Sequence, residues 1–342
     1  MKKFLTITID VEPDCSSDWS YSNPLAFRGM HEGIGEILHP LFEKYAMKPT
    51  YLMNNVVMED AGSVELMNNL QGDFEIGTHL HPEFIEPHKQ FFDYGGKSAR
   101  RNSCFYPAEV EKAKLTSITR IFEDKFNRKA TSFRAGRFSA GANTMKALLE
   151  LGYKVDTSVT PHINWNDATR ERPVNFIDAP EQPYFIKDGT ITGESAKKEG
   201  LLQVPVTIGL IKRNPLQELV ASGMGMRRKI NWNKRVWLRP AFAKLEDMKA
   251  LINQYSHRYA DREAIVFNMM FHNVEVLPGL SPYTLTQYAC DLYKNDLENL
   301  FDFCNIHDIK GICLSDTYSL FKEKPVIQMK NNSRPNVINM IS

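Results

Sequence analysis

The sequence lacks several features that would place it in a specialised class of proteins. It contains no run near the ~20 apolar residues that a helix needs to cross a bilayer. Its five cysteines are scattered and never spaced as CxxC, so neither a disulfide framework nor a zinc ribbon is expected. The 42 Lys and Arg residues balance the 41 Asp and Glu residues. Bulk charge therefore gives no reason to expect nucleic acid as a partner.

The first residues briefly resemble a secretion signal, because two lysines precede an apolar run. That run stops at Asp10, and no small-residue cleavage site follows it. Together with the cysteine pattern, this predicts a cytoplasmic protein without a transmembrane segment. The oligomeric state is left open.

Short apolar runs alternate with amphipathic segments over most of the 342 residues. The expected strands are 4–9, 50–53, 74–77, 132–134, 154–159, 264–271 and 311–314. Helical spacing of apolar residues predicts helices at 34–45, 64–70, 245–255 and 284–303. One further helix is expected to begin at 107, and another to end at 151. This alternation indicates parallel strands joined by βαβ crossovers. Seven or eight such units fit an α/β barrel better than an open sheet.

The rhythm of strands and helices breaks between about 160 and 240, where prolines are frequent. We expect an irregular insertion there, with one strand at 201–208. A single barrel domain is predicted over residues 1–325. The Asn-rich end, 326–342, is expected to be a loose tail.

Two polar clusters follow predicted strands, where barrel enzymes carry their active sites. Because side chains alternate along a strand, Asp10 and Glu12 point to one side, and so do His79 and His81. Two imidazoles and a carboxylate from a neighbouring strand would form a three-ligand site for a divalent ion, with zinc expected. Glu83, four residues after His79, could replace His81. The alternatives are a polar loop after the first strand and two structural histidines.

Two further clusters end later strands: Phe-Arg-Ala-Gly-Arg at 133–137 and Phe-His-Asn-Val-Glu at 271–275. Arg134 carries a permanent charge and suits a carboxylate partner, although a surface arginine is an equal alternative. His272 closes an apolar strand and opens a Pro/Gly loop, a place where catalytic residues often lie. Such a histidine is more often structural. Asp156 could hold the His272 imidazole in one tautomer.

Five segments resemble, in order along the chain, the five motifs of the polysaccharide deacetylases, the NodB-homology or carbohydrate esterase 4 group. They read Thr-Ile-Asp-Val-Glu, Glu-Ile-Gly-Thr-His-Leu-His-Pro, Phe-Arg-Ala-Gly-Arg, Asp-Thr-Ser-Val and Phe-His-Asn-Val-Glu. The resemblance implies a distorted (β/α)₇ barrel. It also implies metal-dependent removal of an acetyl group from an N-acetylated sugar in a polysaccharide or glycan precursor.

The resemblance assigns a role to each matching residue. These roles are general base for Asp10, metal ligand for Glu12 and His79, partner of the base for Arg134, general acid for His272 and support of that acid for Asp156. His81 completes the expected ligand set. The chain departs from the common motifs at three points. Val11 separates the two acids, the histidines are two residues apart instead of four, and Ala135-Gly136 replaces a proline.

Arg137, Glu275 and Trp165 are predicted to contact the substrate. Trp165 would stack on sugar, with packing in the core as an equal alternative. The stretch 226–239 mixes arginines and lysines with Trp232 and Trp237. It reads as a solvated basic face over buried tryptophans, or as a contact for an anionic, nucleotide-linked or lipid-linked sugar. Two other functions remain open: a metal-independent amidohydrolase acting on a small nitrogenous compound, and a barrel that binds glycan without catalysis.

Overall fold

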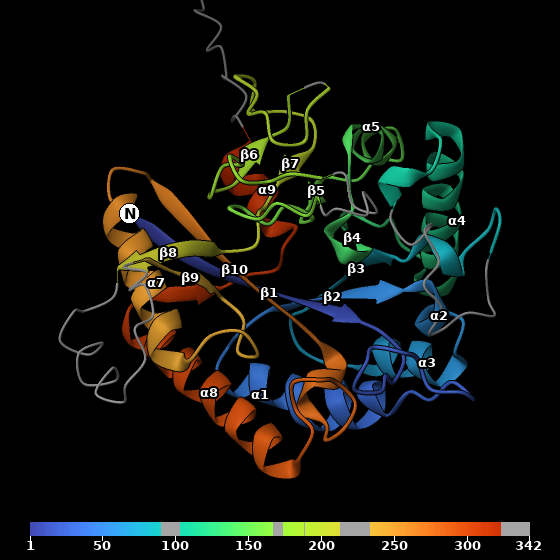
Figure 1. Cartoon of the computed structure of the whole chain (residues 1–342), viewed down its shortest axis with the longest axis horizontal. Helices are drawn as coiled ribbons and strands as arrows, with labels where there is room; N and C mark the ends of the chain where they lie inside the picture. Colours follow the sequence, from blue (N-terminus) through green and yellow to red (C-terminus); the bar gives the residue numbers. More distant parts are fainter. Residues whose placement is uncertain (90–102, 167–173, 188, 213–232, 323–342) are drawn as a thin grey trace, which may run out of the picture.

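The computed structural model describes residues 1–89, 103–166, 174–187, 189–212 and 233–322. Within them, a curled nine-stranded sheet has the order β10-β1-β2-β3-β4-β5-β7-β6, and β11 also pairs with β1 (Figure 1). The strands are β1 (Lys2–Val11), β2 (Pro49–Asn54), β3 (Glu75–Leu80), β4 (Ser132–Ala135), β5 (Val155–Asp156), β6 (Tyr184–Phe185), β7 (Leu202–Gln203), β10 (Ala264–His272) and β11 (Ile309–Gly311). Every pair is parallel except β6 with β7. The predicted α/β class with parallel pairing is confirmed. The number of barrel units stays a prediction.

The helices connect these strands as the alternation predicted. Besides the 3-10 helices given below, they are η1 (Gly29–Leu38), α1 (His39–Lys44), α2 (Asn55–Met58), α3 (Ala61–Asn69), α4 (Ala108–Phe126), α5 (Ala142–Glu150), α7 (Leu245–Arg258), α8 (Gln287–Ile306) and α9 (Asp316–Phe321). In Figure 1, α1 and α8 lie below the sheet, whereas α4 and α5 lie beside β3 and β4. The helix expected at 34–45 begins earlier, and its first ten residues form a π-helix. The strand expected at 154–159 shortens to two residues.

The central strand β1 is buried on both faces, as a parallel strand covered on both sides should be. One face contributes to the main hydrophobic core through Leu5, Ile7, Ile9 and Val11. The opposite face carries the polar series Thr6, Thr8, Asp10 and Glu12, also buried. Polar groups on this face need partners inside the protein, and these partners define the site described below.

The region expected as an irregular insertion contains more regular structure than predicted. The chain after β7 reaches the outer edge of β10, where the Thr207 backbone N–H donates to the carbonyl of Asn268 at 3.0 Å. It then forms β8 (Ile208–Lys212), which pairs antiparallel with β9 (Asn233–Trp237). The single strand expected at 201–208 is therefore β7 and the first residue of β8. Residues 226–232 of the basic stretch and the predicted tail at 326–342 lie outside the described residues.

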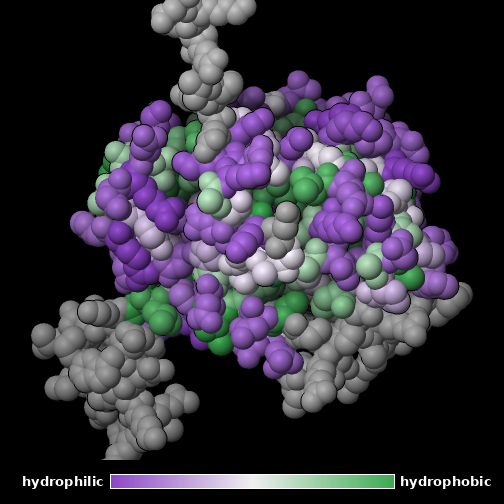
Figure 2. Space-filling view, turned by 90° about the horizontal axis from the view of Figure 1, so that it is seen from above, coloured by the Kyte–Doolittle hydropathy of each residue, from purple (hydrophilic) through white to green (hydrophobic). Residues whose placement is uncertain are grey.

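Short 3-10 helices follow three of the strands that lead to the site. They are η2 (Pro82–Phe84) after β3, η4 (Gly136–Phe138) after β4 and η5 (Asn273–Val276) after β10; η3 (Ser103–Phe105) precedes α4. The face seen in Figure 2 is mostly hydrophilic, with hydrophobic side chains gathered near its middle and along part of its edge. Among the helices of the described residues, none has both the length and the apolar character of a membrane span.

Candidate active site

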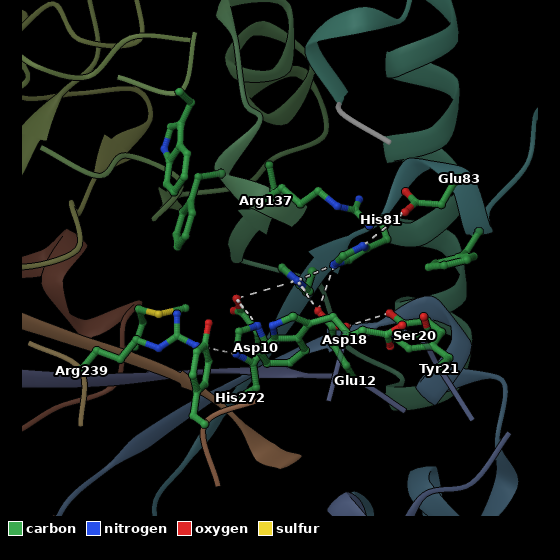
Figure 3. Close-up of a pocket in the computed structure, with 18 of the residues that line it drawn as sticks. Asp10, Glu12, Asp18, Ser20, Tyr21, His81, Glu83, Arg137, Arg239 and His272 are labelled. Atoms are coloured by element: carbon green, nitrogen blue, oxygen red, sulfur yellow. Dashed lines mark hydrogen bonds and ion pairs between the residues drawn. The ribbon is translucent and has the colours of Figure 1, made fainter. Parts of the chain in front are cut away.

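A cavity of ≈ 420 Å³ lies at the carboxyl ends of the parallel strands (Figure 3). Its polar lining comprises Asp10, Glu12, Asp18, Ser20, His79, His81, Glu83, Arg137, Arg239 and His272. Strand register explains why distant segments meet here, because Asp10 lies opposite His272 and His79 lies opposite Arg134. The structure therefore brings together the four predicted clusters, which lie at the ends of β1, β3, β4 and β10.

The first element of the site is a buried ion pair. Arg134 Nη1 donates to Asp10 Oδ1 at 2.7 Å, and Arg134 Nη2 donates to Thr8 Oγ1 at 2.5 Å. Burial raises the pKa of the Asp10 carboxyl, but Arg134, His79 and His272 outweigh it and lower that pKa below its ordinary value. The second oxygen, Oδ2, lies 3.8 Å from His79 Nε2 and 3.9 Å from His272 Nε2. Asp10 is thus a charged carboxylate with one oxygen directed at both imidazoles.

The second element is a cluster of three buried groups. Glu12 Oε1 lies 3.2 Å from His79 Nε2 and 3.0 Å from His81 Nε2, and the two nitrogens are 3.1 Å apart. His79 Nδ1 faces the Arg134 carbonyl at 3.1 Å. A carbonyl only accepts, so Nδ1 carries a proton, and Nε2 is the nitrogen that faces Glu12 and His81.

These three groups fit a divalent ion. Their candidate ligand atoms all lie within 4.8 Å of one another. Ligands about 2.0–2.1 Å from a zinc ion, at tetrahedral or octahedral angles, are separated by about 2.9–3.4 Å, which matches the observed spacings. Burial raises the pKa of Glu12, but His81 and His79 outweigh it and hold that pKa well below its usual range. Glu12, His79 and His81 are therefore the residues that could hold the predicted metal.

Glu83, the alternative third ligand, lies behind His81 instead of in the cluster. Its Oε1 is 3.7 Å from His81 Nδ1 and 2.7 Å from Arg137 Nη2. Burial opposes ionisation, but Arg137 and His81 lower the pKa of Glu83 to about 2.

Arg137 lines the cavity, as expected of a substrate contact, and has a positive φ of 55°. A Cβ at Gly136 would lie 2.8 Å from the Leu80 carbonyl, so this close approach requires glycine.

The third element is His272 with the groups that hold it. Its Nδ1 lies 2.7 Å from Glu275 Oε1, and its backbone N–H donates to the same oxygen at 3.1 Å. Arg239 forms an ion pair with this oxygen, and Tyr293 donates to the other one at 3.1 Å. Because Glu275 is fully buried among these donors, the prediction that it contacts substrate is wrong. It orients His272, leaving Nε2 directed towards Asp10.

The predicted support of His272 by Asp156 is also wrong. Asp156 accepts hydrogen bonds from the Ser158 hydroxyl at 2.6 Å and from the Ser158 backbone at 3.0 Å. Both ring nitrogens of His272 face other carboxylates, those of Glu275 and Asp10. Burial raises the pKa of Asp156 to about 6, although the hydrogen bonds from Ser158 and the charge of Arg134 oppose this shift. The local reason is that η5 turns Glu275 back onto the end of its own strand.

Aromatic rings form much of the remaining lining. They are Trp19, Tyr21, Phe84, Phe138, Trp165, Trp237, Phe242 and Tyr283. Trp165, predicted to stack on sugar, lies nearly parallel to Phe138 with ring centres 6.1 Å apart. Its indole N–H donates to Thr160 Oγ1 at 2.9 Å, which sets the orientation of the ring.

Several residues of the cavity were not anticipated from the sequence, and Arg239, Trp19 and Tyr21 are three of them. Arg239 belongs to the basic stretch but is buried beside His272, where its guanidinium lies 4.2 Å from the Phe242 ring centre. Trp19 packs on His272 with ring centres 4.6 Å apart, and Tyr21 contacts Glu12. Figure 3 places Arg239 and His272 on one side and His81 and Glu83 on the other. No spacing rule links these positions to the motifs.

Comparison with solved structures identifies the fold. The chain superposes on a protein assigned as a polysaccharide deacetylase from Mycobacterium smegmatis with a TM-score of 0.52 and 13% identity, covering 98% of this chain and 96% of that one. A second such protein, from Pseudomonas aeruginosa PAO1, gives a TM-score of 0.51 and 12% identity, covering 93% and 89%. No family model and no curated protein sequence matches the chain. The chain therefore has the fold of the polysaccharide deacetylases, which the sequence motifs predicted.

Proposed function

We propose that this protein is a metal-dependent hydrolase that removes the acetyl group from an N-acetylated sugar. The observation that carries the proposal is the convergence of Glu12, His79 and His81 within 4.8 Å, beside a carboxylate and a third imidazole. A divalent ion held by these residues would supply Lewis-acid chemistry, which activates water and polarises an amide carbonyl at neutral pH.

Asp10 is the general base of the proposed reaction. Its lowered pKa keeps the carboxylate charged at neutral pH, and Arg134 occupies Oδ1. Oδ2 remains on the cavity side, where it can accept the proton of an attacking water. Arg134 is fully buried and has several hydrogen-bond partners, so it holds this carboxylate in one orientation.

His272 is the general acid. Glu275 takes the Nδ1 position, so the proton that is delivered must leave from Nε2. That atom lies 3.9 Å from Asp10 Oδ2. A group that lies within reach of both atoms can therefore receive a proton from His272 after Asp10 has taken one. The departing sugar amine needs this proton because an unprotonated amide anion is a poor leaving group.

Elemental analysis and an acetate-release assay together test the proposal. We expect the purified protein to hold a divalent ion and to release acetate from an N-acetylated sugar. Asp10→Asn should abolish turnover while the ion is retained. A fully active protein free of metal would support the amidohydrolase alternative. Glycan binding without turnover by a metal-loaded protein would support the non-catalytic alternative.

The finer parts of the proposal are zinc as the ion and a nucleotide-linked or lipid-linked sugar as the substrate. Zinc is supported by the chemistry of the candidate ligands, because imidazole and carboxylate groups suit this ion. We also propose that residues 1–325 form a single (β/α)₇ barrel domain. The proposed location of the protein is the cytoplasm. Metal competition tests the identity of the ion, and a panel of linked and free sugars tests the form of the substrate.

A further inference from the structure

The loop between β1 and η1 places one buried tyrosine against the candidate metal cluster. Tyr21 forms an isolated bridge with Cys15, and its ring packs 5.0 Å from that of Phe84. Its hydroxyl lies 2.8 Å from Glu12 Oε2, the oxygen that does not face the histidines. Figure 3 shows Tyr21 beside Glu12 and Ser20 at this edge of the cavity.

The direction of this hydrogen bond follows from Asn54. The Asn54 side-chain oxygen accepts from the Val56 backbone N–H at 2.8 Å, capping α2. Its amide nitrogen is therefore the atom 3.2 Å from the Tyr21 oxygen, and it donates. The Tyr21 oxygen accepts that bond, and its own hydrogen is donated to Glu12 Oε2. A charged carboxylate is a stronger acceptor than a neutral oxygen.

The backbone of Glu12 is held as firmly as its side chain. The Glu12 N–H donates to Asn273 Oδ1 at 2.9 Å, and Asn273 Nδ2 donates to the Glu12 carbonyl at 3.1 Å. Asn273 directly follows His272, so this pair ties the end of β1 to the end of β10. With the backbone fixed and Oε2 engaged by Tyr21, Oε1 is left to face the two imidazoles.

We propose that Tyr21 is a positioning residue that makes Glu12 a one-oxygen ligand of the metal ion. This inference rests on the proposed metal site. A carboxylate that used both oxygens would occupy two coordination positions, whereas a catalytic site needs positions open for water and substrate. Tyr21 prevents this because its hydrogen bond would have to break before Oε2 could turn to the ion. Partners of ligands commonly change metal affinity by about 10-fold to 100-fold.

Cobalt(II) substitution tests the proposal directly, because its visible absorption reports the number and arrangement of ligands. Tyr21→Phe keeps the ring and removes only the hydroxyl. Tyr51→Phe is the matched control, since Tyr51 is fully buried and its hydroxyl pairs with His39 Nδ1 at 3.0 Å. We expect Tyr21→Phe to lower the visible absorption, as a higher coordination number does. Cobalt(II) binding should weaken by about 10-fold. Tyr51→Phe should match the wild type in both.

A second variant covers the case in which Tyr21→Phe fails to fold, which circular dichroism would show. Asn54→Asp keeps the cap of α2 but replaces the donor to Tyr21 by an acceptor, which competes with Glu12 for the hydroxyl hydrogen. It should change the cobalt spectrum in the same direction. A spectrum and affinity unchanged from wild type in both folded variants would overturn the role of Tyr21. A wild-type protein that binds no cobalt or zinc would instead overturn the metal site itself.

Discussion

The two sides of the cavity differ in how their carboxylates are satisfied. On one side, Glu275 receives hydrogen bonds or charge from His272, Arg239 and Tyr293, all of them groups of this chain. On the other side, Glu12 Oε1 faces the nitrogens of His79 and His81. When both imidazoles are neutral, as metal ligands are, their lone pairs and the carboxylate converge on one point and repel one another unless a cation lies between them. A carboxylate whose oxygens are paired with groups of this chain therefore supports another residue. Acceptors that converge on one point form a candidate ligand site.

The largest effect is expected on the ligand side. His79→Ala removes one of the three groups of the cluster, so the protein should lose its ion and its turnover together. Elemental analysis and acetate release measure the two losses in the same preparation. Unchanged metal content in this variant would contradict the assignment of His79 as a ligand.

On the opposite side, His272→Ala should separate turnover from metal content. We expect turnover to fall by about 10²–10⁴-fold, the usual contribution of a general acid, with the ion retained. The readout is again metal content beside the rate of acetate release. Loss of the ion would show that His272 is a ligand, which would erase the difference between the two sides.

A smaller effect should distinguish the real support of His272 from the expected one. Glu275→Gln removes the charge that pairs with Arg239 and orients the imidazole, so we expect turnover to fall by about 10-fold to 100-fold, as for other orienting partners. Asp156→Asn is the matched control, because this buried acid contacts Ser158 instead. Its turnover should stay near that of the wild type. Equal losses in both variants would refute the separate role of Glu275.

The smallest effect concerns stability and pH. The pKa of Asp156 is raised from 3.8 to about 6 by burial, so the unfolded chain releases this proton at lower pH than the folded protein. Its ionisation therefore lowers the free energy of unfolding as the pH rises from about 4 to 6. Asp156→Asn should remove this part of the pH dependence, which urea unfolding at pH 4 and pH 7 measures. An identical pH dependence in the variant would contradict the raised pKa.

Much of the architecture could be predicted from local patterns. Apolar runs of β1 and β10 and the helical spacing in α4, α7 and α8 depend on short-range periodicity, and the structure contains all of them. Boundaries were less accurate, as in β5, which keeps two of the six residues expected. Strand ends depend on which partner strand is available, and this is a tertiary property.

The site was predictable to the extent that it follows from strand alternation and register. Asp10, Glu12, His79, His81 and Arg134 stand near the ends of parallel strands, so their meeting needs only the order of the strands. The polar alternation of Thr6 and Thr8 ahead of Asp10 also marked the inner face of β1. Neighbouring parallel strands bring their carboxyl ends to one edge, whatever the loops do.

The supporting roles of the residues that hold these groups were beyond the reach of the motifs, although Glu275 stands in the last motif as a predicted substrate contact. Glu275, Arg239 and Tyr21 come from a 3-10 turn, the segment just after β9 and a loop, and each is placed by contacts across the fold. Periodicity carries no information about such contacts, because a hydrogen bond depends on where two backbones end in space. The chain's order of residues thus decided the strands, their inward faces and the candidate ligands. Packing alone decided which buried acid supports His272 and which oxygen of Glu12 faces the histidines.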